Sequence, residues 1–206
     1  MTDAPPLGSR LALLSAGSGL VVGAATISLG IQAGIVAAWG FGAACLLQVP
    51  PSLHLWLRIR EGFGNRGLDR ERRTLRITSH LLRLLALGLA IASVLAWTEG
   101  APLSPGVADL VLSAGSAIGF TALWFGKRRL AGLHPSLALD AARLRALAEL
   151  AGLWLLGALL AGMLPWVGPA AGLAMALRLF VEGRTLAKGT TVSLVGCGGC
   201  GSCGCG

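Results

Sequence analysis

The sequence predicts an all-α membrane protein: a six-helix transmembrane bundle followed by a short cysteine- and glycine-rich tail. One reason is composition, because hydrophobic residues make up 54% of the 206 residues and charged residues only 13%, about half the charged share of a typical soluble domain. A second reason is the uncharged segment 11–48. The third is that positive charge is concentrated between apolar segments, as in the loops of polytopic membrane proteins.

The first two spans are expected within the uncharged segment. A continuous helix over residues 11–48 would be about 57 Å long, whereas the hydrocarbon core of a bilayer is about 30 Å thick. We therefore expect two helices in this segment, separated by a turn at Gly30 and Gly34.

Four further spans follow from the remaining apolar segments. Residues 58–76 are basic and polar and are expected to form a loop that is helical near its end. The third span ends at Trp97, a side chain suited to the membrane interface, and TEGAPLSPG (98–106) forms the next turn. The fourth span stops before Lys127, and a hairpin containing Pro165 separates the last two spans. The six expected spans cover residues 11–29, 34–57, 77–97, 107–125, 138–163 and 166–186.

The second span has two unusual features. Pro50 and Pro51 remove backbone donors, so they are expected to kink or end its regular part. Cys45 lies near the small residues Gly40 and Gly42. It is expected to behave as a small hydrophobic residue, and the glycines are expected to allow close contact between helices.

The positions of the positive charges predict the orientation. Seven of the 17 Lys and Arg residues lie in 58–76 and three in 127–129, whereas the other connections between spans carry none. Basic loops remain in the cytoplasm, so both termini are expected there, in a bacterial-type inner membrane. The N-terminal segment lacks the features of a cleaved secretory signal. The protein is expected to interact with the lipid bilayer and not with nucleic acid.

The chain is accordingly divided into three parts. Residues 1–10 form an N-terminal cytoplasmic segment, residues 11–188 the transmembrane domain, and residues 189–206 a cytoplasmic tail. The sequence contains no Ser-His-Asp set, zincin helix or Walker loop, so we expect no enzymatic activity and no catalytic residues.

The tail carries the clearest chemical signal. The last ten residues, CGGCGSCGCG, hold four of the five cysteines in the spacing C-x2-C-x2-C-x-C. Structural disulfides are rare in a reducing cytoplasm, so these thiols are expected to be free or bound to metal, on a tail that is disordered when empty. Thiolates suit Zn(II) or Cu(I), while an iron–sulfur cluster and an inert tail remain alternatives. The expected ligands are Cys197, Cys200, Cys203 and Cys205.

Several ionisable side chains fall within the expected spans. Residues 140–145 are expected near the cytoplasmic face, where arginines extend toward the interface. Glu149 is expected deeper in the bundle, neutralised by Arg83 or Arg178. Such a pair would fix helix packing or contribute to an ion or proton pathway. The candidate intramembrane polar residues are His80, Arg83, Glu149 and Arg178.

Three segments carry a resemblance to a known family. They are GIQAGIVAAWGFGAACLLQ (30–48), LHPSLALDAARLRALAEL (133–150) and VGPAAGLAMALRLFVEGRTL (167–186). With the span layout, they make residues 9–190 similar to the transmembrane domain of the cation diffusion facilitator (cation efflux) transporters. The resemblance implies six spans with both termini inside, a homodimer and a role in cation transport.

The chain departs from that family at the transport site. The resemblance implies a pair of metal ligands four residues apart in each of the second and fifth spans. The matching positions are Ala44 and Gln48, and Arg143 and Leu147, none of which suits zinc. We expect these four residues near one another or in the bundle interior, without a metal site. After about residue 188 the sequence printed here continues only with the cysteine tail, where the resemblance implies a cytoplasmic metal-binding domain, so the resemblance is expected to be that of a divergent member.

Three functions follow as expectations. In the first, the tail captures Zn(II) or Cu(I), and the body transports the metal as a cation efflux-like transporter or delivers it to another protein. In the second, the chain is a non-transporting structural or assembly subunit, as a homodimer or with a partner membrane subunit. In the third, it is a thiol redox protein.

Overall fold

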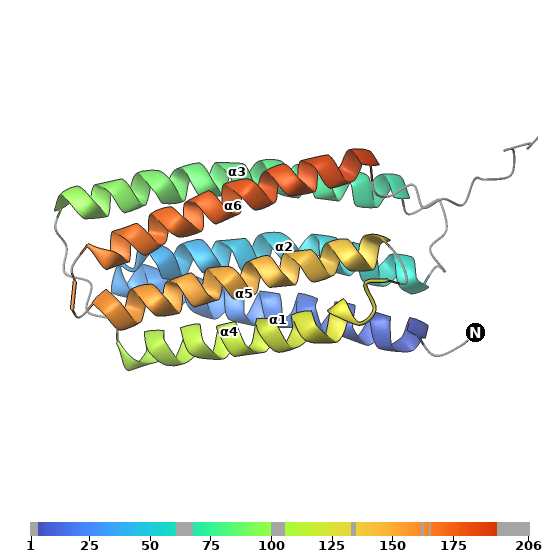
Figure 1. Ribbon diagram of the computed structural model, residues 1–206, viewed down its shortest axis with the longest axis horizontal. Helices are drawn as coiled ribbons and strands as arrows, with labels where there is room; N and C mark the ends of the chain where they lie inside the picture. Colours follow the sequence, from blue (N-terminus) through green and yellow to red (C-terminus); the bar gives the residue numbers. More distant parts are fainter. Residues whose placement is uncertain are drawn as a thin grey trace, which may run out of the picture.

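The computed structural model confirms an all-α bundle. It describes residues 4–60, 68–99, 106–132, 135–161, 163–164 and 166–192, and no strand occurs within these ranges. The helices form one elongated up-and-down bundle (Figure 1). They are α1 (Ala4–Ala33), α2 (Val36–Arg60), α3 (Leu68–Glu99), α4 (Val107–Arg128), α5 (Pro135–Ala161) and α6 (Val167–Val192). The predicted cysteine tail lies beyond Val192, outside the described residues.

Some helix boundaries differ from the predicted spans. Helix α3 already begins at Leu68, so the second half of the expected 58–76 loop is helical. Pro50 and Pro51 lie inside α2, which continues to Arg60. Of the two effects expected of these prolines, an end of the helix does not occur, and a kink stays a prediction. Proline is tolerated in membrane helices because neighbouring groups satisfy the freed backbone atoms.

The helices pair in three layers. Helices α2 and α5 lie in the middle, α1 and α4 cover one side, and α3 and α6 cover the other (Figure 1). Three aromatic rings at the centre of the bundle join the middle layer to α4. The ring centroid of Phe41 in α2 lies 5.4 Å from that of Trp154 in α5 and 6.1 Å from that of Phe120 in α4. All three side chains are buried.

Glycine allows α1 and α2 to pack closely. The two helices are joined by a turn at Gly34, whose φ of 67° lies in the left-handed region that favours glycine. A Cβ added to Gly30 would lie 2.5 Å from the backbone nitrogen of Trp39, and one on Gly23 would lie 2.9 Å from Leu46 Cγ. The predicted role of Gly34 in the turn is confirmed, whereas Gly30 serves the contact between the helices.

The outer surface is suited to lipid. Large apolar side chains are exposed along the outer helices, including Leu20, Leu84, Leu87, Ile91, Ile118 and Leu177. Helices α1 to α5 are each long and apolar enough to cross a membrane, so the protein is a multi-pass membrane protein. Helix α6 has a similar length but contains Arg178, Glu182 and Arg184. It packs along α3 and α5 (Figure 1). That α6 also spans the membrane stays a prediction.

Candidate functional site: a buried charge network

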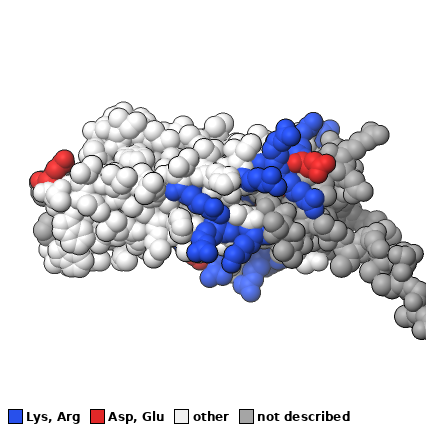
Figure 2. All heavy atoms as spheres, turned by 90° about the horizontal axis from the view of Figure 1, so that it is seen from above, with Lys and Arg blue, Asp and Glu red and all other residues white. Residues whose placement is uncertain are grey.

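Charge is distributed unequally along the bundle. Lys and Arg gather toward one end in Figure 2, whereas most of the other half shows neither sign of charge. This basic end contains the end of α2, the start of α3, the α4–α5 connection and the end of α6 (Figure 1). The lack of basic residues at the opposite end follows from the sequence. No Lys or Arg occurs in residues 11–57, 84–126 and 146–177.

Several charges of the basic half lie inside the bundle. Lys127, at the end of α4, forms an ion pair with Asp140 of α5 and donates a hydrogen bond to Ser15 Oγ of α1 at 2.6 Å. Asp140 also accepts a hydrogen bond from Ser52 of α2 at 3.2 Å. Lys127 and Asp140 are 2% and 1% exposed. Four helices therefore meet at one ion pair.

Arg143 extends this network along α2. Its Nε donates to Gln48 Oε1 at 3.2 Å, and its Nη2 donates to the Gln48 carbonyl oxygen at 3.1 Å and to Ser52 Oγ at 3.3 Å. Nη2 also lies 3.6 Å from Asp140 Oδ1. The planar guanidinium has several fixed donors, which suit it to bridge a side chain, a backbone carbonyl and a carboxylate together.

The predicted placement of the family positions is confirmed. Ala44, Gln48, Arg143 and Leu147 are all buried, and Arg143 bonds to Gln48 directly. The expectation that the arginines of 140–145 extend toward the interface is wrong for Arg143, which is 3% exposed. The physical reason is that Asp140, Gln48 and Ser52 supply its partners within the bundle.

A second buried pair joins α2, α3 and α5. Arg58 forms an ion pair with Glu71 and donates to Ser136 Oγ at 3.1 Å. Arg58 and Glu71 were both expected in the basic, polar loop 58–76, but Arg58 lies in α2 and Glu71 in α3, and both are buried. Helix α3 starts earlier than expected, and this brings Glu71 against the end of α2.

Glu149 has the partner predicted for it. Arg178 Nε lies 2.5 Å from Glu149 Oε2, and Arg145 Nε lies 2.7 Å from Oε1. Arg178 also reaches Glu182 at 3.1 Å. The Glu149 side chain is 37% exposed, so the expectation of a deeply buried pair is wrong. This group lies at the surface where α5 and α6 meet.

The other two predicted intramembrane residues lie elsewhere. Arg83, the alternative partner for Glu149, instead donates from Nη2 to the Gly183 carbonyl oxygen of α6 at 3.4 Å. His80 is exposed on α3. Both line an open groove between α3 and α6 that is otherwise apolar. The structure therefore does not bring the four predicted residues together into one site.

Sequence reasoning missed most of the network. Ser15, Ser52 and Lys127 were not predicted as interior residues. A signal was present in α5, where Ser136, Asp140 and Arg143 are spaced by four and three residues and so share one helix face. A polar stripe on a membrane helix is expected to face the protein interior.

The chemistry of the network does not resemble a cation site. Asp140, its central carboxylate, lies between Lys127 and Arg143, so a divalent metal there would meet two positive charges. Within the described ranges, no three or more His, Cys, Asp or Glu side chains are grouped so as to hold a metal ion. The arrangement can cross-link four helices through buried charges, which are strongly destabilised when one partner is lost.

The comparison with models of known protein families gives no match, and the comparison with curated proteins gives none either.

Proposed function

We propose that this is a membrane-anchored metal-handling protein in which thiolates at the C-terminal side of the bundle capture a soft cation, Zn(II) or Cu(I). The observation that carries this proposal is the sequence CGGCGSCGCG, which follows α6 closely. Soft thiolate ligands select for such metals. The proposed ligand set consists of four cysteines: Cys197, Cys200, Cys203 and Cys205.

The bundle supports a role in delivery or anchoring. Arg143 and Gln48 occupy positions where the resemblance to cation efflux transporters implies ligands, and they bond to one another. Helix α6 ends at the basic end of the bundle (Figure 1). If the basic end faces the cytoplasm, as the positive-inside rule indicates, the tail begins in the compartment where thiols stay reduced.

Metal content of the purified protein tests the proposal. Full-length protein should bind Zn(II) or anaerobic Cu(I) near one ion per chain, and C200S/C203S should lose this binding while still inserting into membranes. Thiolates must lose protons to bind, so affinity should fall at acidic pH. The matched control is C45A, because Cys45 is buried in α2, and it should keep its metal. Equal metal content in C200S/C203S and in the unaltered protein would refute the proposal.

The second candidate is a non-transporting structural or assembly subunit. The buried network favours it, because the charged groups of α4 and α5 pair with one another and with polar groups of α2. Uptake into liposomes distinguishes it from an efflux-type transporter. Protein lacking residues 191–206 should transport no metal in either candidate, and uptake by that variant would show a working pathway through the bundle.

A further inference from the structure

An open groove runs between α3 and α6, the two helices on one side of the bundle (Figure 1). Its volume of about 630 Å³ lies within the range of ligand-binding clefts, about 300–1,000 Å³. Among the described side chains that line it, His80 and Arg83 are polar and none is acidic. Apolar residues form the rest of the walls, including Leu84, Leu87 and Ala90 of α3 and Leu173, Leu177 and Phe180 of α6.

The groove changes character along its length. Helix α3 begins at the basic end of the bundle and α6 ends there (Figure 1). His80 and Arg83 are the lining residues of α3 nearest to that end, and the lining residues that follow on α3, up to Ala90, are apolar. Exposed arginines continue the positive charge, with Arg76 one turn before His80 on α3 and Arg184 near the end of α6. The groove therefore has a basic mouth and an apolar channel.

Arg83 is a cation within a membrane helix that has no carboxylate partner. It lies six residues inside the predicted third span, 77–97. Its Nη2 atom donates to the Gly183 carbonyl oxygen at 3.4 Å, its Nε atom has no hydrogen-bond partner, and no ion pair joins it to an acid among the described residues. The side chain lies close against α6, since a Cβ added to Gly183 would lie 2.9 Å from Arg83 Cγ. A charge within a membrane span is costly unless it is paired, so an anionic partner from outside the chain would lower this cost.

His80 and Arg83 are placed to bind one anionic group together. Residues three apart on a helix lie on one face, with Cβ atoms about 5–6 Å apart. Helical side chains lean toward the N-terminus of their helix, so Arg83 extends toward the turn that contains His80. Glu71 and Glu182, the buried acids of these two helices, are already paired with other arginines. The mouth of the groove is therefore positive, and its donors converge.

We propose that this groove binds one anionic phospholipid, with its phosphate at His80 and Arg83 and one acyl chain along the apolar channel. The basic mouth matches the phosphate, as in other basic pockets between membrane helices. A zwitterionic head group would add an ammonium, and no acid among the described lining residues could pair with it. From His80 to Ala90 the groove follows α3 for about 15 Å, at 1.5 Å per residue, which is half of a hydrocarbon core about 30 Å thick. An acyl chain of one leaflet therefore has the length to fill it.

Competition between two lipids with identical chains tests the proposal. Full-length protein in detergent is mixed with equal amounts of dioleoyl phosphatidylglycerol and dioleoyl phosphatidylcholine, and native mass spectrometry measures the retained lipid. We expect one phosphatidylglycerol per chain, and no displacement by excess glycerol phosphate, which has the charge but no acyl chain. Arg83→Gln should reduce the preference for phosphatidylglycerol roughly tenfold, because charge-assisted hydrogen bonds to the phosphate are lost. Arg83→Lys keeps the charge and should retain most of the preference.

Two further variants separate the groove from general attraction to a basic surface. Arg129→Gln removes an exposed charge directly after α4, which lies on the other side of the bundle (Figure 1), and should leave the preference unchanged. Ala90→Phe fills part of the apolar channel without changing any charge and should weaken retention of the lipid. The proposal is overturned if phosphatidylcholine is retained equally well, if Arg83→Gln has no effect, or if glycerol phosphate displaces the lipid. A detergent-stable dimer that retains no phosphatidylglycerol would assign the groove to a second copy of the chain and would also overturn the proposal.

Discussion

The two ends of the bundle bury charge in opposite ways. At the basic end, Lys127, Asp140 and Arg143 are almost fully buried, yet each has ionic or hydrogen-bond partners from other helices. At the opposite end, Asp109 is equally buried and its Oδ1 atom has no partner. Burial alone therefore does not say whether a charge supports this fold. The difference lies in what the neighbouring helices supply, and substitutions at the two ends should have effects of opposite sign.

The largest effect is expected at Asp140. Asp140→Asn removes the carboxylate between Lys127 and Arg143 and leaves two buried cations facing each other. We expect a loss of about 3–5 kcal/mol in the free energy of unfolding, the usual cost of breaking a buried ion pair. Denaturant unfolding in detergent, followed by helical circular dichroism, measures it.

A double variant provides the control for Asp140. Lys127→Met combined with Asp140→Asn removes both charges of the pair and leaves one buried cation, Arg143, without its carboxylate, whereas Asp140→Asn alone leaves two. The double variant should recover much of the stability that Asp140→Asn loses. If the double variant is less stable than Asp140→Asn, loss of the ion pair does not explain the destabilisation caused by Asp140→Asn.

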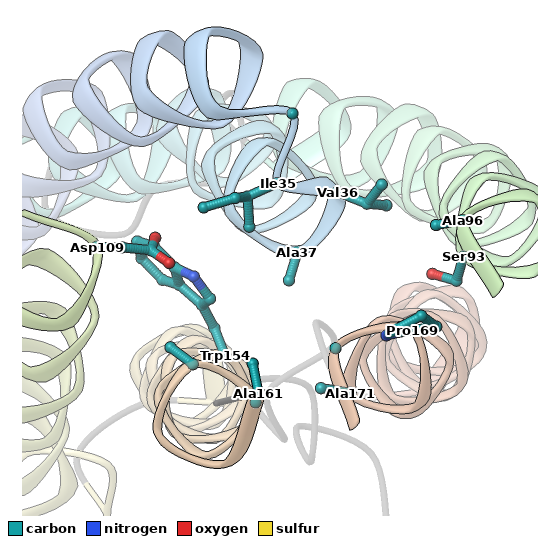
Figure 3. A pocket seen from close by; sticks show the side chains of 14 residues that line it. Ile35, Val36, Ala37, Ser93, Ala96, Asp109, Trp154, Ala161, Pro169 and Ala171 are labelled. Carbon is teal, nitrogen blue, oxygen red and sulfur yellow. The ribbon is translucent and has the colours of Figure 1, made fainter. Parts of the chain in front are cut away.

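A smaller change of opposite sign is expected at Asp109. Asp109→Asn replaces a buried carboxylate, whose Oδ1 atom has no hydrogen-bond partner, by a neutral amide of similar shape. We expect stabilisation by about 1 kcal/mol, since the relieved desolvation cost exceeds the lost helix-dipole interaction. The same unfolding measurement applies, with the exposed Glu99→Gln as a control that should change little. Destabilisation by more than the dipole contribution would mean that the charge of Asp109 strengthens its contact with Trp154 (Figure 3).

The smallest effect is expected at Glu149. Glu149→Gln breaks its ion pairs with Arg145 and Arg178, but the Glu149 side chain is 37% exposed and Arg178 keeps Glu182. Exposed ion pairs contribute about 0.2–1 kcal/mol, so the loss should stay below about 1 kcal/mol. A loss comparable to that of Asp140→Asn would contradict the distinction between the buried network and this surface group.

The fold was largely predictable because its strongest signals are local. Apolar length, the charge-free segment 11–48 and the glycine turn at Gly34 report on helices and their connections directly. Helix ends were less predictable, since basic side chains near a membrane span favour a loop and an extended helix equally well. Only packing against α2 shows that Glu71 belongs to a buried pair.

The site was predictable only in part because its contacts join distant segments. Arg143 and Gln48 are 95 residues apart, and they were placed together because the family resemblance supplied the register. No such guide linked Lys127 to Ser15, which are 112 residues apart. Asp109 lies in the first turn of an apolar helix, and the sequence gives no sign that α5 places Trp154 beside it (Figure 3).

The short turn at Gly34 has a consequence for the order of folding. Helices α1 and α2 are adjacent in the chain and pack through glycine contacts, so their interface requires little loop closure and can form early in synthesis. This hairpin already carries Ser15, Gln48 and Ser52. When α4 and α5 arrive, Lys127 and Arg143 find these acceptors in place. The first pair of helices would thus act as a template that selects the register of the later ones.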